Sequence, residues 1–478
     1  MSDQKPVIVW FRQDLRLRDN PAMSAALEMD APILPVYVLD DESASEFRMG
    51  AASRWWLHQS LKALDADLDG ALLCLSGNVG SVLPRLARNV GAEAVFWNRC
   101  YEPWRLERDK RVKSVLSEDN VKVRSFNGSL LFEPPNVSKD DGDPYKVFTP
   151  FYRKGCLENG PTPRKPGGRS VPTAYFRDHG EESVEDLGLM PDIEWYDGIA
   201  EEWTPGEKGA MDRLREFLDN GLEGYAEGRD RPDKRHVSRL SPHLHFGELS
   251  PNTAWYAVKE YEGRSGFEKS VDKYLSELGW REFSYYLLYY WPSLPTDNLQ
   301  KKFNRFPWRE DDEGLKRWQQ GRTGCPIVDA GMRELWRTGY MHNRVRMITA
   351  SFLVKNLMVH WREGEKWFWD TLVDADLANN SAGWQWVAGS GADAAPFFRI
   401  FNPVTQGKNF DPDGDYVRRY VPELKDLPDE YLHEPWEAPD DVLEEAGIRL
   451  GDTYPQMIVD LKESRERALE AFQALSGK

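Results

Sequence analysis

Several features that would narrow the function are missing from this 478-residue sequence. It has four cysteines and no CxxC pair, so zinc and iron–sulfur sites are not expected, and reduced thiols are. No apolar run approaches the roughly 20 residues that a membrane helix needs. The first residues lack the apolar stretch of a secretory signal. We therefore expect a cytoplasmic protein without a membrane span.

The common catalytic signatures are missing too. There is no P-loop, no HExxH and no recognisable Ser-His-Asp spacing, so a kinase or hydrolase has no support. The first apolar run, "VIVWF", leads into "RQDLRLRDNPA" without a GxGxxG. A dinucleotide is therefore not expected in the usual Rossmann position.

Basic residues are outnumbered by acidic ones, with 62 Lys and Arg against 79 Asp and Glu and a formal net charge of −17. That balance argues against a nucleic-acid partner. The distribution is uneven, however, because residues 301–346 carry eleven basic and six acidic side chains, whereas residues 411–478 carry eight and eighteen. A basic binding face stays open, as does the simpler interpretation that both segments are solvated surface.

What is present begins with an α/β pattern. The runs "VIVWF", "PILPVYVL", "AVFWN" and "VKVRSF" predict strands, and "ASRWWLHQSLKALDADL" between them has the apolar spacing of a helix. This alternation predicts a mostly parallel, Rossmann-like sheet in residues 1–133.

Further along, "EPPNVSKDDGDP" and "GPTPRKPGGRSVP" predict a linker over residues 134–206. Long amphipathic stretches follow, such as "SVDKYLSELGWREFSYYLLYYW" and "MHNRVRMITASFLVKNLMVHW". They predict an all-helical domain over residues 207–478.

Polar side chains interrupt the apolar faces of these helices. Glu277, Trp280 and Arg281 share one helix face, as do Asn343, Arg346 and Met347. Buried polar groups need partners, so either a large polar ligand or an ordinary internal network explains them.

Two further stretches carry polar groups near predicted helix starts. "DADLANNSAGWQW" contains Asp374, Asp376 and Asn380, the last two one helical turn apart. "HVSRLSPHLHFGELSP" places Ser238 and Ser241 in a turn before a helix. These hydroxyls suit either a phosphate or a plain helix cap.

Long stretches of the chain, in order, closely resemble the photolyase/cryptochrome flavoproteins. They are "VIVWFRQDLRLRDNPA", "YKVFTPF", "SRLSPHLHFGELSP", "GWREF", "TGCPIVDAGMRELWRTGYMHNRVRMITASFLVK", "GWQWVAGSGADAAPFFRIFNP" and "YVPEL". The chain is most similar to microbial class I and class III cyclobutane pyrimidine dimer photolyases, and "SRWWLHQSLKAL" is also similar to plant cryptochromes.

The resemblance implies a folded, non-covalent FAD in the helical domain. Its matching positions are Tyr225, Val237, Ser238, Arg239, Leu240, Ser241, Arg281, Asn343, Arg346, Asp374, Ala375, Asp376 and Asn380. Relatives often have Thr where Val237 stands, so one hydroxyl toward a phosphate is missing. Asn380 matches the residue that faces the redox nitrogen, where plant cryptochromes have a protonating Asp.

The resemblance also implies roles for the tryptophans. Trp384, Trp361 and Trp308 match the inner, middle and outer members of an electron-transfer chain. Trp386 lies about 200° from Trp384 on a helix and matches, with Trp280, the aromatic lining of a lesion pocket.

The implied partner is DNA that contains pyrimidine dimers. Arg229, Arg344 and Gln406 match DNA-contacting positions, while Glu277, Asn343 and Met347 match residues facing the dimer. His342 stands alone before Asn343, where enzymes for the (6-4) photoproduct typically carry a histidine pair. The cyclobutane dimer is thus the expected lesion.

Glu102 matches a folate-binding carboxylate of an antenna site, although its neighbours depart from the best-known folate pattern. Methenyltetrahydrofolate is the expected antenna, with a deazaflavin as the alternative. The alternative function is a blue-light photoreceptor, which Asn380 and the lack of a long C-terminal extension disfavour. A flavin electron-transfer protein would not need the lesion-facing residues. A monomer without a metal is expected.

Overall fold

A computed structural model describes residues 5–177 and 182–475 of the chain. Residues 178–181 of the predicted linker and the last three residues of the predicted helical domain lie outside the described residues.

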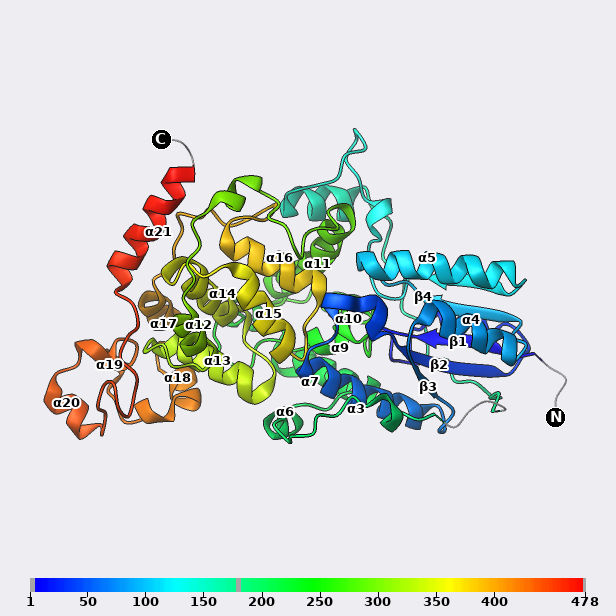
Figure 1. The fold of residues 1–478 in the computed structure, drawn as a ribbon, viewed down its shortest axis with the longest axis horizontal. Coiled ribbons are helices and arrows are strands. Elements are labelled where there is room, and N and C mark those ends of the chain that lie inside the picture. The colour runs from blue at the N-terminus through cyan, green and yellow to red at the C-terminus, as the bar shows by residue number, and fades with distance from the viewer. Residues whose placement is uncertain (1–4, 178–181, 476–478) are drawn as a thin grey trace. The chain divides into compact units, whose positions relative to one another are not determined.

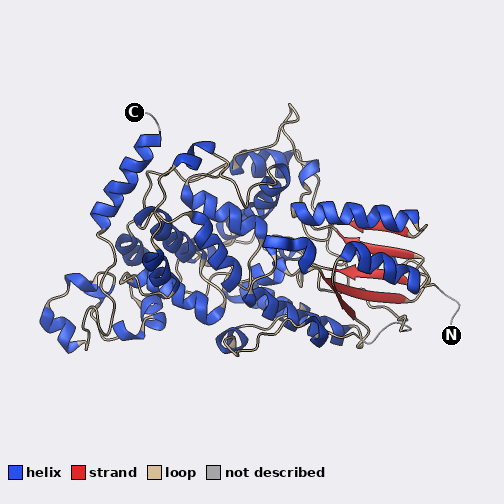
Figure 2. Ribbon diagram, in the orientation of Figure 1, coloured by secondary structure: helices blue, strands red, loops and turns tan. Residues whose placement is uncertain are grey.

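Short apolar runs near the N-terminus form a five-stranded parallel sheet in the described residues. Its strands are β1 (Val7–Phe11), β2 (Ile33–Leu39), β3 (Leu73–Ser76), β4 (Ala94–Asn98) and β5 (Lys122–Phe126). Their order is β3-β2-β1-β4-β5, with Val7 opposite both Ile33 and Ala94. The sheet is drawn in red in Figure 2. The predicted Rossmann-like sheet is confirmed. Strand β3 was not predicted, because "LCLS" is too short to show a period.

Helices cover the sheet because its strands are apolar on both faces. The first helical segments are α1 (Pro21–Leu27), α2 (Asp41–Ala44), η1 (Ser45–Phe47), α3 (Ala51–Asp67), α4 (Val79–Asn89) and α5 (Pro103–Glu118). Ile8 and Trp10 of β1 pack with Leu83 of α4 and Leu116 of α5 in one core cluster. Figure 1 shows α4 and α5 beside the strands. Helix α1 contacts β1, β4 and β5 and begins at the capping residue Asn20, whose side chain accepts from the Met23 N–H.

The region predicted as a linker contains short helical segments. They are η2 (Pro134–Asn136), the π-helical η3 (Pro150–Glu158), η4 (Glu185–Leu187) and α6 (Asp197–Glu202). Residues 159–177 carry no helix, in agreement with their Pro and Gly content.

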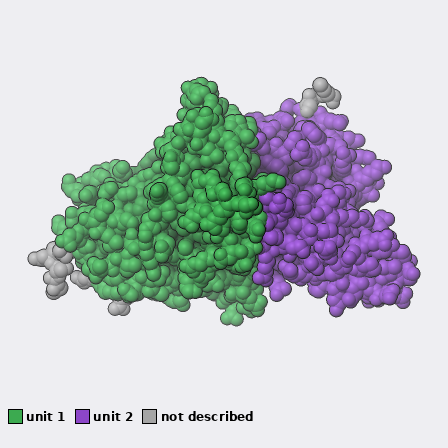
Figure 3. Space-filling model, turned by 180° about the vertical axis from the view of Figure 1, so that it is seen from behind, with its two compact units in different colours: residues 1–223, 238–292, 373–378 green, residues 224–237, 293–372, 379–478 purple. Residues whose placement is uncertain are grey.

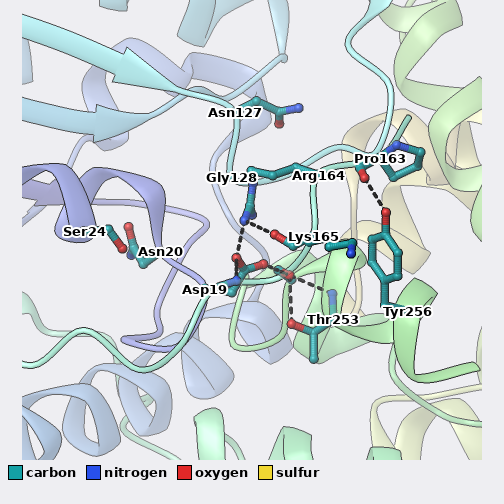
Figure 4. A network of polar contacts seen from close by, with 12 residues as sticks. Asp19, Asn20, Ser24, Asn127, Gly128, Pro163, Arg164, Lys165, Thr253 and Tyr256 are labelled. Atoms are coloured by element: carbon teal, nitrogen blue, oxygen red, sulfur yellow. Dashed lines mark hydrogen bonds and ion pairs between the residues drawn. The ribbon is translucent and has the colours of Figure 1, made fainter. Parts of the chain in front are cut away.

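That helix-free stretch is fixed by Asp19, as Figure 4 shows. One carboxylate oxygen of Asp19 accepts from the Gly167 N–H at 2.6 Å and from Arg164. The other accepts from the Ser250 hydroxyl at 2.5 Å. The Tyr256 hydroxyl adds a 2.6 Å bond to the Pro163 carbonyl. The stretch is therefore held by partly buried polar contacts in place of regular structure.

The rest of the described chain is helical, as predicted. Its segments are α7 (Glu207–Asn220), α8 (Tyr225–Gly228), α9 (Ser241–His245), α10 (Pro251–Lys259), α11 (Glu268–Tyr290), η5 (Lys301–Arg305), α12 (Asp312–Gln319), α13 (Pro326–Thr338), α14 (Asn343–Ser351), η6 (Phe352–Asn356), α15 (Trp361–Thr371), α16 (Leu377–Ala388), α17 (Pro403–Phe410), α18 (Asp415–Tyr420), η7 (Pro422–Leu424), α19 (Asp429–Leu432), η8 (Pro435–Glu437), α20 (Asp440–Glu445) and α21 (Leu461–Leu475).

Two helix predictions need correction. The stretch from Met341 to Trp361 is not one helix, because α14 passes into the π-helical turn η6 and the chain then breaks at Met358, which has a φ of 59°. A new helix, α15, begins at Trp361. Asp376 lies just before α16, whereas Asn380 lies within it, so only Asn380 is helical.

The chain forms two compact units, coloured in Figure 3. Unit 1 comprises residues 1–223, 238–292 and 373–378, and unit 2 comprises residues 224–237, 293–372 and 379–478. This division is by compactness and crosses the predicted domains. The predicted domain boundaries after residues 133 and 206 therefore stay a prediction.

Candidate functional site

Both units contain predicted site residues, and each unit is described by itself. Unit 1 holds Glu102, Ser238, Arg239, Leu240, Ser241, Glu277, Trp280, Arg281, Asp374, Ala375 and Asp376. Unit 2 holds Tyr225, Arg229, Val237, Trp308, Asn343, Arg344, Arg346, Met347, Trp361, Asn380, Trp384, Trp386 and Gln406.

In unit 1, Asp376 is a buried carboxylate beside a guanidinium. Its Oδ2 accepts from the Tyr285 hydroxyl at 2.5 Å and lies 3.2 Å from Nδ1 of His245. Burial alone would raise its pKa, but His245, the charge of Arg281 and the Tyr285 hydroxyl together lower it. Arg281 lies on α11 and donates to the Ser129 carbonyl at 3.0 Å. Unit 1 thus offers an ionised acid and a fixed cation.

The turn before α9 has an unusual backbone. Arg239 has a φ of 53°, and its guanidinium pairs with Glu202 and lies 4.4 Å from the centre of the Trp203 ring. Ser238 accepts from the Tyr274 hydroxyl at 3.4 Å. Ser241 is exposed at the first position of α9, and Leu240 holds the capping position without a side-chain cap. In the structure, Ser241 therefore does not cap α9.

Trp280 is the outer ring of an aromatic stack in unit 1. Its ring lies 3.8 Å from Phe148, centroid to centroid, with 11° between the planes. Phe148 stacks in turn on Tyr152 at 5.5 Å and 9°. Gly279 makes this packing possible, since a Cβ there would lie 2.5 Å from the Tyr152 ring. The partly exposed Trp280 indole is thus supported from behind as a flat surface.

Glu277 and Glu102 both have partners within unit 1. Glu277 lies one turn before Trp280 on α11 and 3.5 Å from the Lys273 ammonium. Glu102, which is 4% exposed, accepts from Gln13 at 3.0 Å and pairs with Arg105 at 2.7 Å. These two partners hold the nearly buried Glu102 carboxylate in a fixed orientation.

In unit 2, Asn380 is oriented by a backbone contact. Its Nδ2 donates to the Glu365 carbonyl at 3.1 Å. The amide oxygen is therefore directed elsewhere and suits an N–H donor. An amide accepts such a bond but has no proton to give at neutral pH.

Two arginines of unit 2 share one carboxylate. Arg344 pairs with Asp230 at 2.9 Å, and Arg229 lies 3.7 Å from the other oxygen of Asp230. The Arg344 guanidinium also lies 4.4 Å from the centre of the Phe410 ring. Both cations are thus held in place by groups around them, which suits phosphate contacts.

The predicted tryptophan chain lies entirely in unit 2. Trp384 is buried against Phe368, with ring centres 5.0 Å apart. A Cβ at Gly364, one turn after Trp361 on α15, would lie 2.1 Å from the Trp384 ring, so these helices touch at this glycine. Trp361 is fully buried and donates from Nε1 to Asn298 at 2.9 Å. Trp308 is partly exposed and packs on Phe306, with ring centres 4.4 Å apart.

The other predicted residues of unit 2 differ in exposure. Tyr225 is buried and lies under the Arg229 guanidinium at 5.8 Å. Asn343 is exposed at the start of α14, and Met347 is partly exposed one turn later. Trp386 and Gln406 are both partly exposed. A ligand can therefore reach Asn343, Met347, Trp386 and Gln406.

Comparison with known proteins decides the family. A model described as "DNA photolyase" matches residues 7–167, and one described as "FAD binding domain of DNA photolyase" matches residues 274–474. A deoxyribodipyrimidine photo-lyase of Agrobacterium fabrum is 49% identical over 98% of both chains. The chain belongs to the photolyase/cryptochrome family.

Other members of the family are also similar over the full described chain. A bacterial class III photolyase structure from Agrobacterium tumefaciens has a TM-score of 0.95 at 49% identity, covering 100% of this chain and 99% of the other. Cryptochrome-1 of Arabidopsis thaliana is 40% identical over 98% of this chain and 70% of the relative.

The residues present fit the FAD that this photolyase family binds. Within unit 1, Asp376 is an ionised acceptor and Arg281 is a cation, groups that are chemically compatible with such a ligand. Within unit 2, Asn380 presents an amide oxygen and Arg346 is a cation, and these are compatible with it too. No group of three or more His, Cys, Asp and Glu side chains in the described chain could hold a metal.

The sequence alone did not identify the residues that pack against or hydrogen-bond the predicted site residues. Phe148 and Tyr152 lie in and after the quoted "YKVFTPF" motif, yet only the tertiary fold brings them behind Trp280. Asp230 adjoins Arg229 in the sequence, and that spacing was a usable signal of an ion pair. No sequence pattern predicts the bond between Asn298 and Trp361, because 63 residues separate them.

Proposed function

We propose that this protein repairs cyclobutane pyrimidine dimers in DNA by light-driven electron transfer. The observation that carries the proposal is the end-to-end likeness to the Agrobacterium enzyme named deoxyribodipyrimidine photo-lyase. FAD, when bound in its reduced form, supplies the excited-state electron for the lesion. The electron splits the cyclobutane ring and then returns, so a turnover involves no net oxidation or reduction.

The chain's own residues bind and orient the lesion in this proposal. Arg229 and Arg344 contact phosphates on either side of the damage, and Gln406 adds a polar contact. The dimer leaves the stack and lies against Trp280, which Phe148 keeps flat, and against Trp386. Glu277 and Asn343 hydrogen-bond the thymine carbonyls, and Met347 fills the remaining apolar contact.

Trp384, Trp361 and Trp308 serve a different step. They pass one electron inward to return the coenzyme to its working state, and the oxidised Trp308 is finally reduced by an external thiol. Burial of Trp361 and Trp384 supports this role, because it keeps water from the inner members. The chain is not needed in each repair turnover.

Asn380 favours repair over signalling. A carboxylic acid at this position would supply a proton to the coenzyme, whereas the Asn380 amide, held through one N–H by the Glu365 carbonyl, has no acidic proton to transfer. The electron therefore stays available for the lesion. A blue-light photoreceptor is the second candidate, since Cryptochrome-1 of Arabidopsis thaliana is similar over nearly all of this chain.

The antenna, assembly and location belong to the same proposal. Methenyltetrahydrofolate is the antenna, with a deazaflavin as alternative, and Glu102 is its contact through exchange of the Gln13 bond. Acid extraction and absorbance of the released chromophores identify it. The protein acts as a monomer in the cytoplasm, where its four buried cysteines stay reduced. Within the described part of the chain, no helix is long and apolar enough to cross a membrane.

A defined repair assay tests the function. Reduced, flavin-loaded protein is illuminated with blue light on an oligonucleotide that carries one thymine dimer, and a (6-4) photoproduct serves as the control lesion. We expect repair of the dimer only, and none in the dark. Repair of the control lesion alone would contradict the substrate. Flavin binding without repair of either lesion would favour the photoreceptor.

A further inference from the structure

His360 contacts two members of the predicted tryptophan chain in unit 2. Its ring centre is 5.6 Å from that of Trp361, with 29° between the planes, and 5.1 Å from that of Trp308, at 61°. It is therefore stacked on the middle indole and meets the outer indole at an edge.

A hydrogen bond fixes the orientation and the tautomer of this imidazole. His360 caps α15, and its Nδ1 accepts from the Arg362 N–H at 3.1 Å. A nitrogen that accepts carries no proton, so the neutral ring has its proton on Nε2. Burial lowers the pKa of His360, and Arg362 and Lys366 lower it further against the opposing effect of Glu363. The imidazole is thus neutral near pH 7.

The indoles on either side are also fixed. Trp361 donates to Asn298 at 2.9 Å, and Asn298 in turn donates to Asn304 at 3.0 Å. Trp308 packs against Phe306, and its Nε1 is buried without a hydrogen-bond partner in the described residues. No described protein group therefore accepts from the Trp308 indole N–H, and the nearest aromatic neighbours of its ring are Phe306 and His360.

We infer that His360 is a positioning residue that bridges the electron transfer from Trp308 to Trp361. One electron passes from Trp308 to the oxidised Trp361, and the imidazole is neither oxidised nor protonated. Its polarisable ring occupies the space next to both indoles, which a smaller side chain would leave to water or to a void. A neutral ring also adds no repulsion to the positive charge that travels outward. This inference rests on the proposed role of the tryptophan chain.

Two substitutions separate the ring from the helix cap. His360→Asn keeps an acceptor for the Arg362 N–H, because Asn is a favoured capping residue, but it removes the ring. His360→Phe keeps a flat ring and removes the acceptor. We expect the flavin-loaded Asn variant to unfold at nearly the parent temperature, and the flavin-loaded Phe variant to unfold at a lower one.

Photoreduction should rank the two flavin-loaded variants in the opposite order to their unfolding temperatures, because it depends on the ring and not on the helix cap. We expect severalfold slower photoreduction and a smaller transient signal of oxidised Trp308 in His360→Asn, and nearly parental values in His360→Phe. His433→Asn, which removes another buried imidazole of unit 2, should leave photoreduction unchanged. Parental photoreduction in His360→Asn, or equal loss in the Asn and Phe variants, would overturn the inference.

Trp361→Phe and Trp308→Phe distinguish this inference from the proposed function. Both should slow photoreduction while the chemically reduced enzymes still repair dimers. If neither slows it, the proposed tryptophan chain is wrong. If both slow it and His360→Asn does not, only the bridging role is wrong.

Discussion

At the scale of single residues, the surroundings decide the protonation state. His342 is 3% exposed and caps α14, where its Nδ1 accepts from the Arg344 N–H at 3.2 Å. Burial lowers the pKa of His342 to about 4, and the nearby Arg229, Arg344 and Arg346 add to the effect against Asp230. The His342 imidazole is therefore neutral in the folded protein near pH 7.

This shift predicts a pH-dependent stability. The folded pKa lies below the ordinary value of 6.5, so the unfolded chain binds the proton more readily. The contribution of His342 is complete above pH 6.5 and is lost as the pH falls toward 4, by up to about 3 kcal/mol. His342→Asn keeps the cap and removes the titrating group. Urea unfolding of flavin-free protein at pH 7, 6 and 5 should show a smaller loss in the variant, and equal losses would contradict the assignment.

At the scale of elements, a glycine sets how closely two helices approach. Gly364 of α15 lies against the Trp384 ring and against Leu353, each within 2.7 Å of where a Cβ would stand. Gly383, on α16 beside Trp384, is exposed and has nothing within 4 Å of that position. The two glycines differ only in what surrounds them.

Alanine substitutions at these glycines should have opposite effects. Gly364→Ala forces Trp384 to move and should lower the free energy of unfolding by about 1–3 kcal/mol. Gly383→Ala, the matched control, should raise it by about 0.5–1 kcal/mol, because it removes glycine from a helix interior. Chemical unfolding measures both changes. Equal effects would mean that the contact between Gly364 and Trp384 does not constrain the packing.

At the scale of the whole molecule, a net charge of −17 has to be reconciled with DNA binding. Phosphate contacts are local, so a few oriented arginines suffice even on an acidic protein. Arg344, with its side chain 19% exposed and paired with Asp230, is the group for which we propose such a contact. The salt dependence of binding reports these contacts and not the net charge.

The salt dependence gives a test of that argument. Arg344→Gln should reduce the slope of log affinity against log salt by about 0.9, the value for one phosphate contact. Fluorescence anisotropy with undamaged and dimer-containing DNA should give the same change for both. Arg215→Gln, which removes a cation of unit 1 that pairs with Asp212 at 2.8 Å, is the control and should leave the slope unchanged. A parental slope in Arg344→Gln would exclude this phosphate contact.

The sequence predicted the elements better than the environment of each side chain. The strands β1 and β4 and the single helix α11 were predicted because their periodicity is local. The break at Met358 was not, because a positive φ in a non-glycine residue depends on the packing around it. The roles given to Trp384, Glu277 and the other site residues stay predictions.

By itself, the sequence determined the fold class, the family and the residue types available for chemistry, because motifs and periodicity are properties of the chain. Only the tertiary structure decided that Phe148 lies behind Trp280, that Asp230 holds Arg344 and that His360 contacts Trp308. The physical reason is distance along the chain. Contacts between residues tens or hundreds of positions apart arise from helix packing, and no local pattern encodes them.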